Sequence, residues 1–201
     1  MLTPGQPVPA LTVSTLDDNR FDTTRDLGEN GALVVFYRGA HCPKCKEQLK
    51  EIAGAAKKAE EMGLALLLAS GDDNRKAKAM AEETGVEPRH VGYDLTMTQA
   101  RDWGLWISTA REGSEEPTLF AEPGVFHILP DGTLYAAWLQ SHPFARPAFD
   151  DILGAVQFRL DKDYPARGQY TGPLAEHDGG VKLEAPDGPN AQAYGNTSTA
   201  D

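Results

Sequence analysis

Residues 32–46 read ALVVFYRGAHCPKCK, an apolar run followed by two cysteines with two residues between them. The run 32–37 has the length and the β-branched composition of a buried strand. Proline is well tolerated in a helix only within its first turn, so Pro43 predicts a helix that begins beside Cys42. The stretch therefore predicts a strand that leads into the N-terminus of a helix.

The two cysteines of this stretch predict a dithiol redox site. The free N–H groups and the positive end of the helix dipole favour a thiolate at Cys42, and Arg38, Lys44 and Lys46 add positive charge nearby. We therefore expect the pKa of Cys42 to lie below the ordinary thiol value of about 8.5. Cys45 follows about one helical turn later, which is close enough for a disulfide.

A zinc site and a purely structural disulfide are less favoured uses of the pair. Structural zinc needs four ligands, and the chain has no other cysteine. The histidines that would have to complete such a site stand singly, at His41, His90, His127 and His142. A bridge across two residues restrains the unfolded chain very little. We therefore predict no metal, and we interpret His127, within an apolar run, as a core histidine.

Length and composition indicate one ordinary globular domain, with 201 residues of which 40% are hydrophobic. The formal net charge of −11 argues against nucleic acids and anionic membranes as partners, since both would be repelled. The first residues, MLTPGQPVPALTV, lack the pattern of a secretory signal, so a cytoplasmic location is expected. In a reducing compartment a two-cysteine chain is more often catalytic than cross-linked.

Hydrophobic periodicity and turn residues predict the remaining elements. We expect a hairpin around the turn 17–19, strands over 64–69, 90–94, 125–129 and 133–139, and helices over 43–62, from 72 or 73 to about 84, 96–103 and 148–160. The charged stretch 112–122 is expected to be irregular. Alternating strands and helices that end in a hairpin and a closing helix predict an α/β fold with helices on both faces of a mixed sheet.

From about Tyr164 the chain becomes rich in Gly, Pro, Ala, Asp and Asn and poor in bulky apolar residues. Such a composition cannot enclose a core of its own. We therefore expect one folded domain over residues 1–163, followed by a tail or extended arm over 164–201.

Three features of the sequence belong together: FYRGAHCPKC at 36–45, the Trp103-Gly104 pair that ends a helix, and VFHILPDGTL at 125–134. They resemble the peroxiredoxin-like proteins of the alkyl hydroperoxide reductase and thiol-specific antioxidant family, within the thioredoxin-like superfamily. The resemblance covers roughly residues 5–160. It implies a thioredoxin-like fold, a central mixed sheet flanked by helices with an N-terminal hairpin and a C-terminal extended arm. It also implies a thiol-dependent antioxidant oxidoreductase that reduces hydroperoxides.

The conserved residues of the family can be aligned with this motif in two ways. In the peroxidase alignment Cys45 attacks peroxide, while Arg38 takes the place of the family's proline and Cys42 that of its threonine. The family's second arginine then falls at Pro123. In the thioredoxin-type alignment Cys42 is the exposed attacking thiol and Cys45 resolves, so that the protein would reduce disulfides.

The thioredoxin-type alignment also makes predictions for other positions. It places Pro123 where thioredoxins carry a cis-proline, so the Glu122–Pro123 bond is expected to be cis. Val35 then occupies the position of the buried thioredoxin carboxylate, which leaves Glu122, His41 or water as proton acceptor. In disulfide exchange we expect Cys42 to be the nucleophile, and the sequence leaves open which of the two cysteines attacks peroxide.

The expected site thus has Cys42 and Cys45 as catalytic residues, lined by Tyr37, Arg38, His41, Pro43, Lys44, Glu122 and Pro123. No glycine-rich phosphate loop or dinucleotide fingerprint is present, so no cofactor is expected. Reducing equivalents must then come from a partner thiol or a thioredoxin-like reductant. The competing hypothesis is a non-enzymatic binding module whose cysteines are idle, and a homodimer stays open.

Overall fold

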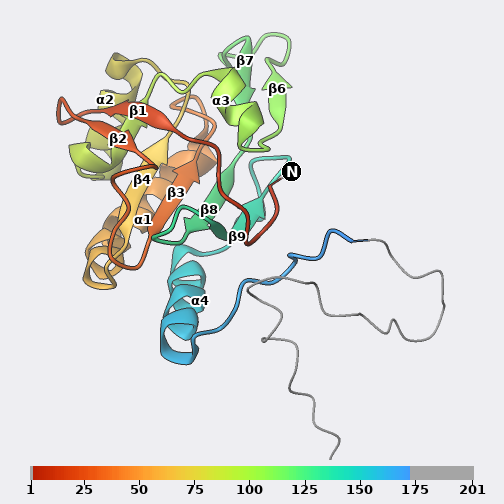
Figure 1. Ribbon diagram of the computed structural model, residues 1–201. Helices are drawn as coiled ribbons and strands as arrows, with labels where there is room; N and C mark the ends of the chain where they lie inside the picture. The colour runs from red at the N-terminus through yellow and green to blue at the C-terminus, as the bar shows by residue number, and fades with distance from the viewer. Residues whose placement is uncertain (1, 173–201) are drawn as a thin grey trace, which may run out of the picture.

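The computed structural model describes residues 2–172, and its centre is a mixed sheet (Figure 1). The strands of this sheet are β1 (Thr12–Thr15), β2 (Arg20–Asp22), β3 (Ala32–Phe36), β4 (Ala65–Ala69), β5 (Val91–Tyr93), β8 (Gly124–Ile128) and β9 (Leu134–Leu139). The helices are α1 (Pro43–Glu61), α2 (Asn74–Thr84), the 3-10 turn η1 (Pro88–His90), α3 (Met97–Asp102) and α4 (Phe149–Lys162). A second, small sheet pairs β6 (Ile107–Thr109) with β7 (Leu119–Ala121).

The strands of the main sheet follow the order β2-β1-β5-β4-β3-β8-β9. The central strands β3, β4 and β5 are parallel, and antiparallel strands flank them on both sides. β3 lies between β4 and β8, so that Val34 is opposite Leu67 on β4 and Phe126 on β8. Every residue of β3 is buried, as the apolar run predicts.

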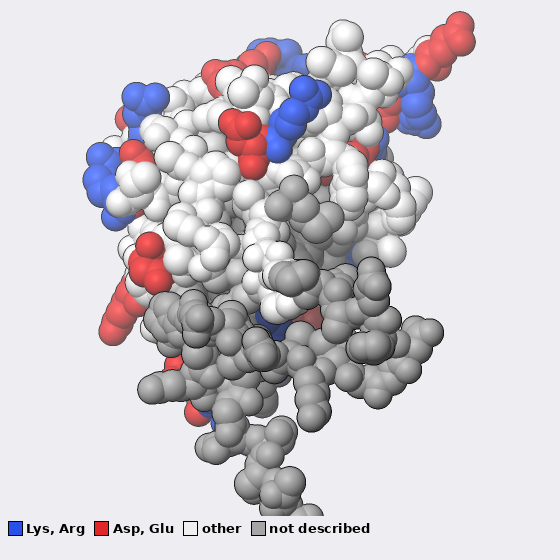
Figure 2. Space-filling model, turned by 45° about the vertical axis from the view of Figure 1, so that its right-hand side comes forward, with Lys and Arg blue, Asp and Glu red and all other residues white. Residues whose placement is uncertain are grey.

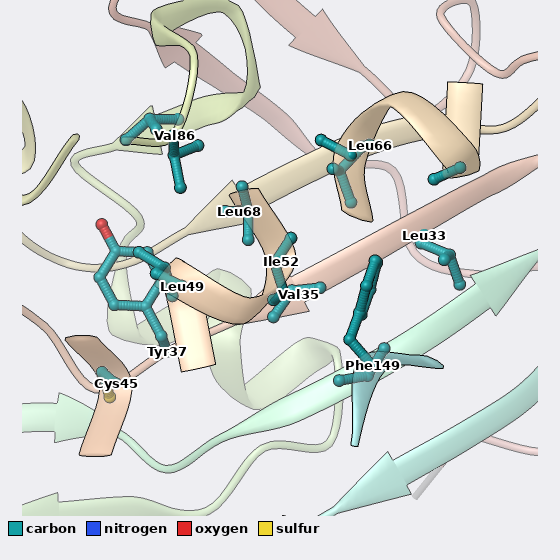
Figure 3. Close-up of a cluster of buried hydrophobic side chains, with 14 of the residues drawn as sticks. Leu33, Val35, Tyr37, Cys45, Leu49, Ile52, Leu66, Leu68, Val86 and Phe149 are labelled. Carbon is teal, nitrogen blue, oxygen red and sulfur yellow. The ribbon is translucent and has the colours of Figure 1, made fainter. Parts of the chain in front are cut away.

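Alternate residues of β3 belong to two hydrophobic clusters, one on each face of the sheet. The first cluster packs Leu33 and Val35 against α1, α2 and α4. Figure 3 shows Cys45 and Tyr37 at one end of this cluster and Leu33 and Leu66 at the other. The second cluster packs the opposite face against α3 and the N-terminal segment. Helices therefore cover both faces, as expected, and the cysteines border the first core.

The helix boundaries follow from local sequence. Asp73 caps α2 by accepting a hydrogen bond from the N–H of Lys76, at 2.8 Å. Thr96 and Gln99 form a capping box at the start of α3. Pro43 is the first residue of α1, as expected, and Cys42 is its N-cap.

The prediction that the charged stretch 112–122 is irregular is wrong for its last part. Residues 119–121 form β7, which pairs with β6 so that Ile107 lies opposite Ala121. The pairing brings together apolar residues that a long polar loop separates in the chain. The stabilisation comes from contacts between the two strands, which the local hydrophobic periodicity of either strand does not predict. This hairpin stands apart from the main sheet in Figure 1.

The described part of the C-terminal arm, residues 164–172, packs on the domain. The hydroxyl of Tyr135 donates a hydrogen bond to the carbonyl of Tyr164 at 3.0 Å, and Ala166 is buried. The rest of the predicted arm, 173–201, lies outside the described residues. The division into a domain over 1–163 and an arm over 164–201 stays a prediction.

Charged side chains are spread over the surface. On the face shown in Figure 2, acidic and basic side chains are interspersed with broad uncharged areas, and no large basic patch is visible. Within residues 2–172 no helix combines the length and the apolar character needed to cross a membrane.

Candidate functional site

Both cysteines sit at the start of α1, where the chain leaves β3. Cys42 has an extended backbone as the N-cap, and Cys45 lies within the first turn. Both thiols are free, and the two residues are only 1% and 0% exposed, respectively. The expectation of an exposed Cys42 is therefore wrong, because arginine side chains from two separate loops cover the sulfurs.

The environment of Cys42 strongly favours its thiolate and lowers its pKa to about 5. The largest cause is a hydrogen bond from the Cys45 thiol, and the backbone N–H of Cys45 and the guanidinium of Arg38 add to it. The charge of Arg146 acts in the same direction, whereas burial opposes it. The predicted low pKa is therefore supported, with Cys45 as the main cause.

The pKa of Cys45 is shifted in the opposite direction to that of Cys42. Burial raises its pKa well above the ordinary value, and the neighbouring Cys42 thiolate raises it further. Its sulfur accepts a hydrogen bond from the N–H of Arg38 at 3.3 Å. The pair therefore shares one proton, which stays on Cys45 while Cys42 carries the negative charge.

Arg38 follows β3 and reaches the Cys42 sulfur at 3.7 Å. Its guanidinium also forms buried ion pairs with Glu116 at 3.1 Å and with Glu122 at 3.3 Å. The ring of Phe120 lies 4.6 Å from the guanidinium carbon, so the cation is held from a third side. The hairpin β6–β7 supplies these partners and thereby fixes the position of Arg38.

Arg146 is a site residue that the sequence did not reveal. One of its terminal nitrogens lies 3.3 Å from the Cys45 sulfur and 3.9 Å from the Cys42 sulfur. Its other nitrogens donate to Gln48 on α1 at 2.5 Å and to the carbonyl of Pro143 at 3.0 Å. It belongs to the loop between β9 and α4, and no local pattern in that loop indicates a contact with residues a hundred positions earlier.

The lysines expected to assist the thiolate point elsewhere. Lys44 forms an ion pair with Glu47 at 2.6 Å, and Lys46 forms one with Glu83 at 2.7 Å. Because residues on a helix point in directions about 100° apart, these neighbours of the cysteines face away from the sulfurs. Neither is among the main causes of the lowered pKa of Cys42, which are Cys45 and the two arginines.

His41 and Tyr37 lie beside the dithiol. The His41 ring packs edge-on against Phe120, with ring centres 4.9 Å apart, and its two nitrogens have no hydrogen-bond partner among the described residues. Burial and the charge of Arg38 lower the pKa of His41, so its ring is neutral at pH 7. Tyr37 is buried, and burial raises the pKa of its hydroxyl.

A buried carboxylate that acts on both His41 and Tyr37 is Asp72, which the sequence indicated only as a possible helix cap. It accepts hydrogen bonds from the N–H of Ala40 at 2.8 Å and from the hydroxyl of Ser70 at 3.0 Å. Burial raises its pKa. Asp72 thereby fixes the turn that carries His41 toward the N-terminus of α1.

The Glu122–Pro123 bond is trans, so the predicted cis bond is wrong. The segment runs extended from β7 to β8. The N–H of Glu122 donates a hydrogen bond to the carbonyl of Trp106, and the carbonyl of Pro123 accepts one from the N–H of Gln140. Pairing on both sides keeps the backbone straight at this point. Glu122 nevertheless belongs to the site, because its carboxylate pairs with Arg38 and accepts from Ser108 at 2.7 Å.

Within residues 2–172 no cluster of three or more His, Cys, Asp or Glu side chains could hold a metal ion. The site brings together a buried thiolate, a protonated thiol and two guanidinium groups. Such a set can attack an electrophilic oxygen or sulfur and then form a disulfide.

Comparison with known proteins identifies the family. The model of the AhpC/TSA family matches residues 4–137, well over half of the chain. The chain belongs to this family. Membership in the AhpC/TSA family makes it a thiol-dependent peroxidase with an antioxidant role, as the resemblance implied. No curated protein matches the sequence.

Solved structures of peroxiredoxins have the same fold at low sequence identity. Reduced Prx3 from Vibrio vulnificus in complex with hydrogen peroxide is 21% identical, with a TM-score of 0.65 over 78% of this chain and 99% of that one. AhpC from Enterococcus faecalis is 18% identical, with a TM-score of 0.64 over 82% and 98%. Peroxidoxin BcpB from Mycobacterium tuberculosis is 19% identical, with a TM-score of 0.62 over 78% and 97%. The predicted thioredoxin-like fold is confirmed.

Proposed function

We propose that Cys42 and Cys45 form the redox centre of a thiol peroxidase, with Cys42 as the nucleophile and Cys45 as the resolving thiol. The observation that carries this proposal is the opposite protonation of the two sulfurs. The pKa of Cys42 is about 5, whereas burial raises that of Cys45. At neutral pH only Cys42 is a thiolate, the form that attacks peroxides and disulfides.

In the first step the Cys42 thiolate attacks the terminal oxygen of a hydroperoxide. The O–O bond breaks, Cys42 becomes a sulfenic acid, and the alkoxide or hydroxide leaves and takes up a proton. The guanidinium groups of Arg38 and Arg146 both face this sulfur and can stabilise the charge that develops on the leaving oxygen.

In the second step Cys45 gives up its proton and attacks the Cys42 sulfur. Water leaves, and a Cys42–Cys45 disulfide forms. The guanidinium of Arg146 contacts the Cys45 sulfur and favours its thiolate at this stage. Because both cysteines lie at the start of one helix, this disulfide does not require one helix to move against another.

A thioredoxin-type disulfide reductase is the second candidate, because Cys42 caps the helix and Cys45 follows within its first turn. The burial of both sulfurs favours peroxide, since hydrogen peroxide is small, whereas a protein disulfide must reach the sulfur directly. The trans bond before Pro123 removes the cis-proline on which the thioredoxin-type alignment relied. A neighbour in fold, Prx3 from Vibrio vulnificus, was solved with hydrogen peroxide, which also supports this substrate.

Two small thiols would regenerate the pair as it stands, whereas a thioredoxin-like reductant would need Arg38 and Arg146 to move off the buried sulfurs first. A reducing compartment such as the cytoplasm supplies such reductants. The formal charge of −11 supports the absence of nucleic acid and anionic membranes among the partners. A homodimer is compatible with this proposal but is not needed for the chemistry, since one chain supplies both cysteines.

The function is tested by hydroperoxide consumption with dithiothreitol as reductant. We expect turnover with the native chain and loss of turnover in Cys42→Ser. With a disulfide substrate in place of peroxide and without dithiothreitol, we expect Cys45→Ser to be trapped as a mixed disulfide at Cys42. An insulin reduction assay, run in parallel, separates the two candidates. Insulin reduction at a rate comparable to that of peroxide would favour the disulfide reductase instead.

A further inference from the structure

The two arginines at the dithiol differ in their counter-charges. Arg38 is paired with two buried carboxylates, those of Glu116 and Glu122. Arg146 has no carboxylate within ion-pair distance among residues 2–172, and its partners apart from the sulfurs are the neutral oxygens of Gln48 and Pro143. Among these described residues, the thiolate of the Cys42/Cys45 pair is therefore the only negative charge that Arg146 contacts.

This arrangement depends on the redox state. In the reduced pair the thiolate balances the charge of Arg146. When the sulfurs join in a disulfide, the thiolate charge disappears while the guanidinium keeps its own. A partly buried cation without a counter-charge is unfavourable, so the oxidised protein gains by binding an anion at this point.

A groove leads from the surface to Arg146. Its volume is about 370 Å³, and it is lined by the first turns of α1 and by the loop 143–148. This size suits a small molecule rather than a folded partner. The exposed ring of Phe144 and the prolines Pro143 and Pro147 form the loop side of the groove, and Gln48 joins the helix side to Arg146.

The other charged groups of the groove are already paired. Lys44 and Glu47 neutralise each other at 2.6 Å. Glu51 accepts a hydrogen bond from the N–H of Phe149, at the positive N-terminal end of α4. Neither carboxylate is therefore a ready replacement for the lost thiolate, and Arg146 is left as the group that an incoming anion would meet.

We propose that the disulfide form binds a small thiol bearing a carboxylate in this groove, with the carboxylate on Arg146, and that this thiol is the preferred reductant. The inference rests on the proposed Cys42/Cys45 cycle and specifies its reductant. The bound thiolate attacks the Cys42 sulfur, the S–S bond breaks, and Cys45 leaves as a thiolate that takes up a proton. A second thiol then attacks the mixed disulfide, releases the oxidised reductant and restores the Cys42 thiolate.

The overall charge of the protein predicts the opposite preference. A net charge of −11 repels anionic thiols and attracts cationic ones. An anionic preference would therefore have to arise from a local group, which makes the comparison of thiols of different charge a sharp test.

The test uses the full chain converted to the disulfide with diamide, so that it does not depend on peroxide chemistry. Reduction is followed by the return of protein thiols with 3-mercaptopropionate, 2-mercaptoethanol and 2-aminoethanethiol, which are anionic, neutral and cationic and of similar size. Each rate is divided by the concentration of the thiolate form of the reductant. It is then compared with the rate of the same thiolate on oxidised 2-mercaptoethanol, a small neutral disulfide, because a more basic thiolate is intrinsically the faster nucleophile. We expect the anionic thiol to be about tenfold faster than the neutral one, with the cationic thiol slowest, and we expect added salt to reduce the difference.

Two variants assign the preference. Arg146→Gln should reduce the anionic preference to about one, whereas Lys44→Gln, which removes the other cation of the groove, should keep it. Equal rates for anionic and neutral thiols in the native chain would overturn the inference. So would a preference that survives Arg146→Gln or disappears in Lys44→Gln. If Arg146→Gln does not fold, the order of the three rates in the native chain and the salt dependence of that order still test whether an anionic reductant is preferred.

The outcomes separate this inference from the proposed function. If diamide forms the disulfide and the three thiols show no anionic preference, only the reductant assignment fails. If diamide cannot form the disulfide, the Cys42/Cys45 cycle and the inference fail together.

Discussion

The guanidinium of Arg146 lies 3.3 Å from the sulfur of Cys45, a residue 101 positions earlier in the chain. The contact closes the site from the side of the loop between β9 and α4. Arg38 approaches the sulfur of Cys42 from the β3 side, 3.7 Å away. Two cations from distant segments thus converge on one buried dithiol. Together with the hydrogen bond from the Cys45 thiol, which is the largest cause, they favour a Cys42 thiolate at a position only 1% exposed.

The first prediction concerns the ionisation of Cys42. Its alkylation rate should rise with pH around a midpoint near 5 and be constant from pH 7 to 8, because the pKa of its thiol is about 5. In Cys45→Ala the midpoint should shift upward, since a hydrogen bond from the Cys45 thiol is the largest cause of the low pKa. Iodoacetamide labelling with mass spectrometry measures this, and a midpoint at about 8.5 in the native chain would contradict it.

The second prediction concerns Arg38. Arg38→Met leaves the carboxylate of Glu122 buried without its cation, so the free energy of unfolding should fall by about 3 kcal/mol. The same change should raise the pKa of Cys42. Urea unfolding and the alkylation profile measure the two effects. Arg25→Gln, which breaks an exposed ion pair with Asp26, serves as the control and should leave the urea midpoint unchanged. Equal midpoints for the two variants would show that the Arg38 pairs do not stabilise the fold.

The third prediction concerns His127, which is fully buried in β8. Burial, with a further contribution from the charge of Arg159, lowers its pKa to about 4. In the unfolded chain the ring takes up a proton near pH 6.5, which the folded chain resists until about pH 4. The contribution of His127 therefore reduces stability as the pH falls from 6.5 to 4, by roughly 3 kcal/mol in total.

Urea unfolding at pH 7 and pH 4.5 measures this effect. His127→Leu should lose less stability between the two pH values than the native chain does, whereas His142→Gln at an exposed position should lose as much. An identical pH dependence in His127→Leu and the native chain would assign the acid sensitivity to other groups.

The fourth prediction concerns the end of the domain. A chain that ends after Gly172 should keep its thermal stability, because the sequence beyond is poor in bulky apolar residues. A chain that ends after Asp163 should melt at a lower temperature, since it loses the buried Ala166 and the bond from Tyr135 to Tyr164. Thermal unfolding compares the two. An insoluble chain after the first truncation would place residues beyond Gly172 in the core.

The fold could be predicted from local sequence because its main elements carry their own signals. The apolar run of β3, Pro43 at the first position of α1 and the Thr96 capping box each specify a structure within a few residues. The hairpin β6–β7 lacked such a signal, because its strands are short and are joined by a charged loop. Its formation depends on packing that only the folded chain provides.

The site could be predicted only where it is local. Cys42, Cys45 and Arg38 lie within eight positions and were recognised together. Arg146 was missed because it stands in an irregular loop before α4, and contacts over such a separation leave no trace in one sequence. Lys44 was assigned to the site by closeness in sequence, although its direction on the helix turns it toward Glu47.

The central claim, that Cys42 attacks peroxide and Cys45 resolves it, is tested most directly by one equivalent of hydrogen peroxide followed by intact mass measurement in the presence of dimedone. The native chain should lose two hydrogens as the disulfide forms. Cys45→Ser should form a dimedone adduct at Cys42, because its sulfenic acid cannot be resolved, and Cys42→Ser should remain unmodified. A dimedone adduct at Cys45 in Cys42→Ser, with no reaction of Cys45→Ser, would contradict the account and reverse the roles of the two cysteines.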